Sequence, residues 1–81
     1  SDPVSRLYAA QAIAKKGGLE AVRVLSEAMK NDRFWGVRAE IAESLATIKL
    51  DQAVEAVIAG LNDPEARVRR VIATCLAQIA T

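Results

Sequence analysis

The chain has no histidine, one cysteine, two prolines, four glycines and one residue each of Phe, Trp and Tyr. Without histidine, the segment cannot form a Ser-His-Asp triad, a histidine general base or the usual zinc sites. We therefore expect that it is not itself an enzyme and that it holds no cofactor or metal of its own. The single cysteine, Cys75, excludes an internal disulfide, which fits a reducing compartment.

The sequence also lacks a long apolar run and a dominant charge. No apolar stretch approaches the roughly 18–20 residues of a membrane-spanning helix, and the start of the chain is unlike a signal peptide. We expect a cytoplasmic protein without a membrane partner. Eleven basic and ten acidic residues leave a net charge of +1, so the chain has no overall field to attract nucleic acid. The basic clusters at Lys15-Lys16 and Arg67-Val68-Arg69-Arg70 are too small for a continuous positive stripe.

Apolar residues that favour helices form the largest part of the chain. The chain is 52% hydrophobic, and Ala, Leu, Ile and Val supply nearly all of this fraction. Ala and Leu favour helices, whereas strands favour aromatic and β-branched residues. An all-β fold needs many turns, and the chain has few of the prolines and glycines that such turns use. The composition therefore predicts an all-α protein.

The sequence repeats itself with a period of about 31 residues. Residues 31–38 align with residues 62–69 at a shift of 31, and the segments before them align at a shift of 32. Each unit shows two apolar stripes at helical spacing, which predicts two helices per unit. The first-helix stripes are Leu19, Val22, Leu25 and Met29 in one unit and Ala53, Val54, Val57, Ile58 and Leu61 in the next. The second-helix stripes are Val37, Ile41, Leu45 and Ile48, followed by Val68, Ile72, Leu76 and Ile79.

The pattern predicts five helices, at roughly 3–15, 19–30, 34–48, 51–61 and 65–80. Asp63 is expected to cap the last helix with Pro64 at its first position, and Asp32 should cap the helix at 34–48 in the same way. Gly17-Gly18 should end the first helix in a left-handed conformation.

The helix at 3–15 resembles the second half of a unit, and no polar cap closes the C-terminal end. We therefore expect residues 1–81 to form one repeat domain that is a fragment of a longer chain. Its repeat ends are candidates for self-association.

Two helices per roughly 31 residues, an Asp-Pro turn and the Val-Arg pairs Val37-Arg38 and Val68-Arg69 resemble the HEAT repeat family, especially its short HEAT-like branch. The resemblance covers practically the whole chain. It implies a right-handed α-solenoid of about five helices. HEAT-like arrays serve as scaffolds, enzyme appendages and nucleic-acid clamps alike, so this fold does not select one function.

Residues 32–40, with the sequence Asp-Arg-Phe-Trp-Gly-Val-Arg-Ala-Glu, look like a segment in the C-terminal helical domain of aminopeptidase N-type zinc metallopeptidases. This resemblance implies a noncatalytic domain that packs on the catalytic domain of the same polypeptide and shapes substrate access. Zinc would then belong to another domain of the parent chain, since none of the family's His ligands is present here. The alternative is an independent HEAT-repeat scaffold that binds another protein.

The candidate structural or interaction residues lie at the two repeated turns and the helices that follow them. Arg38 and Arg69 are interpreted as partners of turn acids rather than as anion contacts. Phe34-Trp35 is either a docking anchor or a packing element between repeats, and Gly36 would allow a close backbone approach. Cys75 is interpreted as a packing residue. The complete set is Asp32, Phe34, Trp35, Gly36, Val37, Arg38, Asp63, Pro64 and Arg69.

Overall fold

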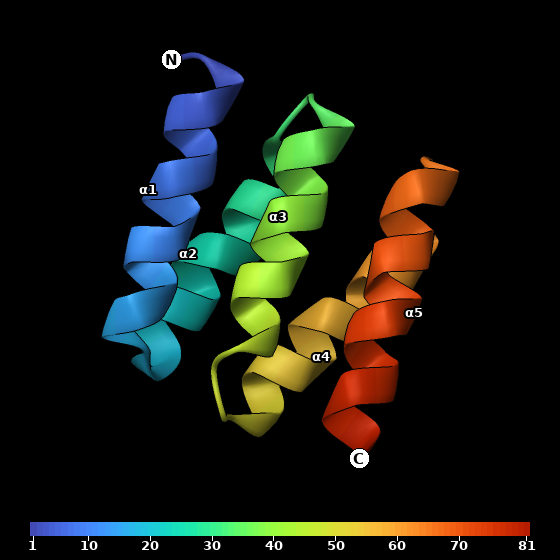
Figure 1. The fold of residues 1–81 in the computed structure, drawn as a ribbon. Helices are drawn as coiled ribbons and strands as arrows, with labels where there is room; N and C mark the ends of the chain where they lie inside the picture. Colours follow the sequence, from blue (N-terminus) through green and yellow to red (C-terminus); the bar gives the residue numbers. More distant parts are fainter.

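The computed structural model describes all 81 residues as five α-helices and one short 3-10 helix, without strands. The elements are α1 (Pro3–Lys16), α2 (Gly18–Asn31), α3 (Trp35–Ala46), α4 (Asp51–Ala59), η1 (Gly60–Asn62) and α5 (Ala66–Ala80). The second helices α1, α3 and α5 lie side by side in one layer, and the first helices α2 and α4 form a second layer behind them (Figure 1). This arrangement confirms the predicted all-α solenoid.

The hydrophobic core lies between the two layers and is centred on α3, which packs against all four other helices. The stripe predicted for α3 is buried along its whole length, and Val37 and Leu45 are completely inaccessible to solvent. In α5, Val68 and Ile72 are buried in the same way. Period-3.6 spacing therefore predicted the buried face of both helices.

Four residues of the predicted stripes are exposed, contrary to the expectation. Leu19 is 59% exposed, Ile58 46%, Leu61 43% and Ile79 37%, because no helix of the chain packs over them. Near the end of α5, the buried side chain is Cys75, and its neighbour Leu76 is only half-buried.

The predicted N-caps at the two repeated turns are wrong. Asp63 lies before the helix, where its Oδ1 accepts the N–H of Glu65 at 2.9 Å. Glu65 is the N-cap of α5 and accepts the N–H of Arg67 with its own side chain, so Pro64 precedes the helix. Similarly, Asp32 Oδ1 accepts the N–H of Phe34, and that residue is the N-cap of α3. Both carboxylates are held outside the helices by arginines of the preceding repeat, as described below.

Further boundaries differ from the prediction, since α4 ends at Ala59 instead of residue 61 and is followed by η1. Helix α3 ends at Ala46 instead of residue 48, and Ile48 is buried in the turn that follows. Gly17 ends α1 with a φ of 68°, as expected for glycine, but its ψ of −167° is extended rather than left-handed helical. Only glycine adopts this combination of angles readily.

Candidate functional site: an inter-repeat groove and its Asp–Arg ladder

One arginine near the start of each second helix reaches back to the turn that precedes that helix. In all three cases, Nη1 donates a hydrogen bond to a backbone carbonyl of the turn. The contacts are Arg6 to Ser1 at 2.6 Å, Arg38 to Asp32 at 2.9 Å and Arg69 to Asp63 at 2.7 Å.

Two of these arginines also bind the aspartate of the following repeat. Nε and Nη2 of Arg6 donate to Asp32 at 2.7 and 3.1 Å. The same atoms of Arg38 donate to Asp63 at 2.8 and 3.1 Å. The side chains of Arg38 and Asp63 are 14% and 8% exposed, so this pair is largely shielded from water. We call these contacts the Asp–Arg ladder; they join successive repeats through planar, two-point ion pairs.

The ladder keeps both aspartates ionised. The hydrogen bond from Arg6 is the main cause that lowers the pKa of Asp32. Burial opposes ionisation of Asp63, but hydrogen bonds from Arg38 and from the Glu65 N–H outweigh it and lower its pKa. The reciprocal contacts raise the pKa of both arginines further above their ordinary value. Arg38 and Asp63 therefore form a stable ion pair, which agrees with the interpretation of Arg38 as the partner of a turn acid.

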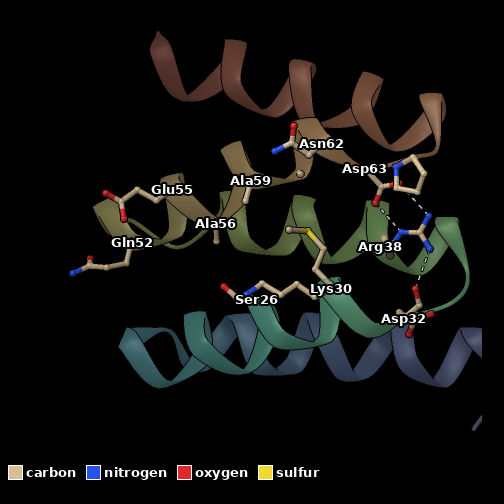
Figure 2. A pocket seen from close by; sticks show the side chains of 13 residues that line it. Ser26, Lys30, Asp32, Arg38, Gln52, Glu55, Ala56, Ala59, Asn62 and Asp63 are labelled. Carbon is tan, nitrogen blue, oxygen red and sulfur yellow. Dashed lines mark hydrogen bonds and ion pairs between the residues drawn. The ribbon is translucent and has the colours of Figure 1, made fainter.

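A groove of about 580 Å³ runs between the first helices α2 and α4. Figure 2 shows Arg38 with Asp63 and Asp32 at one end of the groove, and Gln52 and Glu55 at the other. The apolar and small residues of its lining are Met29, Ala56, Ala59, Gly60 and Pro64. Its polar residues outside the ladder are Ser26, Lys30, Gln52, Glu55 and Asn62.

Four of the nine predicted site residues line this groove, namely Asp32, Arg38, Asp63 and Pro64. The polar residues on α2 and α4 were not predicted. In the sequence these residues look like ordinary solvent-facing residues of a helix. The groove depends on the distance between two helices, which the sequence pattern does not give.

Trp35 links α3 to α5. The guanidinium carbon of Arg67 lies 4.0 Å from the centroid of the Trp35 ring, within the range of a cation–π contact. Trp35 is half-buried against the core, whereas Phe34 is 42% exposed. A Cβ at Gly36 would lie 2.9 Å from Cε2 of Phe34. Gly36 therefore makes room for the ring of Phe34, not for the backbone of another repeat.

The remaining residues that the sequence singled out take part in core packing or in the structure of a turn. Val37 is fully buried. The interpretation of Arg69 as the partner of a turn acid is wrong, because its side chain donates only to the backbone carbonyl of Asp63 and forms no ion pair. Burial raises the pKa of Cys75, which keeps the thiol protonated and unreactive. Partial burial and the charge of Glu40 also raise the pKa of Glu43, although this residue is exposed at the surface.

The groove is lined by small, apolar and polar side chains, and its lining contains no cysteine. No group of three or more Cys, Asp or Glu side chains is placed to hold a metal ion. Every buried side-chain nitrogen or oxygen has a hydrogen-bond partner. None of the helices is long and apolar enough to cross a membrane.

Comparison with known proteins agrees with this architecture. The HEAT repeats family matches residues 1–77, which is nearly the whole chain. Searches among curated proteins and among solved structures found no match. The match includes both repeated turns, and the structure shows the paired helices that such repeats form. The chain therefore belongs to the HEAT repeat family.

Proposed function

We propose that the chain is a noncatalytic scaffold that binds a segment of a protein in the groove between α2 and α4. The observation that carries this proposal is the groove itself, which is lined by Met29 and several small residues together with polar side chains from both helices. Its volume of about 580 Å³ lies within the range of about 300–1,000 Å³ that is typical of binding sites. The Asp–Arg ladder stiffens one end, so little ordering is needed on binding.

The chemistry of the lining favours a peptide over a strongly charged ligand. Gln52 and Asn62 each offer an amide that can both donate and accept hydrogen bonds, as a peptide backbone requires. Lys30 and Glu55 contribute opposite charges, so the exposed polar lining has no net charge. Arg38 is already bound to Asp63 and is not available to capture an anion.

Selection of random 12-residue peptides displayed on phage against the purified chain tests the proposal. The Ala59→Trp variant fills the groove from an exposed position, and Ala12→Trp adds the same ring to an exposed position of α1 as a control. Selected peptides should bind the parent chain and Ala12→Trp in calorimetric titrations but lose binding to Ala59→Trp. Failure to enrich any peptide, or equal binding to all three proteins, would contradict the proposal.

A finer proposal is that the partner is the catalytic domain of a zinc aminopeptidase in the same polypeptide. The support is the sequence of residues 34–40, which resembles the C-terminal helical domain of that family. Phe34, 42% exposed beside the first turn of α3, offers an aromatic side chain for packing on another domain. This chain has no His ligands for the zinc, so the metal would lie wholly in the catalytic domain.

Sequencing the complete open reading frame that contains this segment tests the finer proposal. We expect a His-Glu-x-x-His motif upstream, with a further Glu ligand beyond it. A frame that encodes helical repeats alone would contradict the aminopeptidase proposal and leave the scaffold proposal unchanged.

A further inference from the structure

Two charged side chains of the groove between α2 and α4 have no partner within the chain. Lys30 and Glu55 both line the groove and are exposed, and neither belongs to an ion pair. The other charges of the lining, Asp32, Arg38 and Asp63, are all held in the Asp–Arg ladder. Lys30 and Glu55 are therefore the charges of the groove that are free to bind another molecule.

Both free charges depart from the repeat pattern of the chain. At the shift of 32, Gln52 and Glu55 of α4 correspond to an acidic and a basic residue of α2. Those residues, Glu20 and Arg23, form an ion pair of 2.6 Å. Because α4 has no arginine at these positions, the Glu55 carboxylate is not neutralised in this way. Lys30 is the extra residue between the segments aligned at shifts of 32 and 31, so the next repeat has no counterpart of it.

The two free charges lie on opposite walls of the groove and at different positions along it. Lys30 is in the last turn of α2, whereas Glu55 lies on α4 toward the end of the groove away from the ladder (Figure 2). The position on α2 that is equivalent to Glu55 is Arg23, seven residues before Lys30. At about 1.5 Å per helical residue, the two positions differ by about 10 Å along the helices. This distance equals about three residues of an extended chain, which rises about 3.3 Å per residue.

We infer that the groove binds an extended segment of a partner protein with an acidic and a basic side chain three residues apart, the acid paired with Lys30 and the base with Glu55. Successive side chains of an extended chain point to opposite sides, so two residues at this spacing face the two walls. The backbone of an extended segment also leaves N–H and C=O groups free for the amides of Gln52 and Asn62. A helix uses those groups internally. The inference rests on the proposed function, since it names the kind of segment that the same groove selects.

The 12-residue peptides selected on phage test the spacing. The enriched sequences should share one acidic and one basic residue three positions apart. Synthetic peptides in which this spacing is changed to two or four should bind about two- to fivefold more weakly in calorimetric titrations, because one ion pair is lost. Equal binding at spacings of three and four would overturn the inference in favour of a helical occupant, since both spacings share one face of a helix. Enriched sequences without a common acid–base pair would overturn it as well.

Charge reversal tests which wall binds which side chain. Glu55→Lys should weaken binding about fivefold or more, since it exchanges an attraction for a repulsion. Replacing the basic residue of the peptide by Glu should restore the affinity for this variant. Lys30→Glu should respond in the same way to a peptide whose acidic residue is replaced by Lys. Glu27→Lys and Lys49→Glu, at exposed positions outside the groove lining, are the matched controls for the change in net charge.

The outcomes separate this inference from the proposed function. If no peptide distinguishes the parent chain from Ala59→Trp, both are contradicted. Peptides that need the open groove but keep their affinity for Glu55→Lys and Lys30→Glu would overturn the inference alone. A loss of binding that the charge-reversed peptides do not restore would also overturn it, because the peptide charges would then not be paired with these two residues.

Discussion

Arg38 and Asp63, 25 residues apart in the sequence, form a two-point ion pair whose two hydrogen bonds measure 2.8 and 3.1 Å. The third donor group of Arg38 binds the carbonyl of Asp32, so one side chain connects the turns of two successive repeats. Because α3 is the central helix of the layer that α1, α3 and α5 form, this contact joins these repeats at one end of the groove between α2 and α4.

The first prediction concerns the loss of this pair. Arg38→Ala should lower the free energy of unfolding by about 1–3 kcal/mol, because it leaves the largely buried carboxylate of Asp63 without its charged partner. Arg6→Ala should have a smaller effect, since the Arg6 side chain is 32% exposed and water can replace it. Urea unfolding followed by circular dichroism measures both. Equal losses for the two variants would contradict the role assigned to burial.

The second prediction concerns acid. Hydrogen bonds from Arg67 hold the pKa of Glu65 at about 2, below its ordinary 4.5, and the ladder lowers the pKa values of Asp32 and Asp63. The unfolded chain therefore binds more protons than the folded chain between pH 4.5 and about 2. Its stability should fall as the pH decreases through this window.

Melting temperatures measured from pH 7 to pH 2 test this expectation. Glu65→Gln should reduce the acid sensitivity, because it removes one of the carboxylates with a lowered pKa. A melting temperature that stays constant down to pH 2 would rule out the proposed linkage.

The amino-acid sequence predicts most of the fold because burial follows helical spacing. The stripe on α3 is buried as predicted, since α3 has neighbours on every side that the stripe faces. Helical spacing wrongly predicts that Leu61 and Ile79 are buried. Periodicity indicates an apolar face of a helix but does not show whether another helix covers that face.

The candidate site could be predicted only in part. An arginine that follows each turn aspartate by six residues, Arg38 after Asp32 and Arg69 after Asp63, suggested ion pairing with the acid of its own or a neighbouring turn. The capping expectation for Asp32 and Asp63 was wrong because local preference favoured a helix cap, whereas the ladder arginines hold each carboxylate one step before the helix. No local sequence pattern distinguishes the groove residues, such as Gln52, from other surface residues.

The third prediction concerns Glu43, whose pKa is raised by burial and by the charge of Glu40. A raised pKa means that the folded state disfavours the ionised form, so the charge destabilises the protein above that pKa. Glu43→Gln should therefore raise the melting temperature at pH 7 and leave it unchanged near pH 3. Glu27→Gln, at an exposed position of α2, is the control and should change neither value. A lower melting temperature of Glu43→Gln at pH 7 would contradict the prediction.

The fourth prediction concerns the surroundings of Trp35. Arg67 covers one face of the ring at 4.0 Å, so Arg67→Ala should expose that face and shift the tryptophan emission to longer wavelengths. Quenching by iodide should increase as well. Arg70→Ala, three residues along the same helix, should leave the spectrum unchanged. An identical spectrum in Arg67→Ala would mean that Arg67 does not shield the ring in solution.

The fifth prediction compares two glycines that make room for a neighbouring side chain. A Cβ at Gly60 would lie 2.6 Å from Cδ1 and 3.0 Å from Cγ1 of Ile72, which is completely buried. Gly60→Ala should therefore lower the free energy of unfolding by about 1–3 kcal/mol, because the completely buried Ile72 would have to shift within the packed core. At Gly36, the nearest atom belongs to the ring of Phe34, which is 42% exposed and can turn toward solvent.

Gly36→Ala should therefore change the free energy of unfolding by no more than about 0.5 kcal/mol. The better helix propensity of alanine in α3 offsets the displacement of the Phe34 ring. Urea unfolding of both variants at the same pH measures the contrast. A larger loss for Gly36→Ala than for Gly60→Ala would show that the turn before α3, and not the packing of η1 on α5, is the more constrained contact.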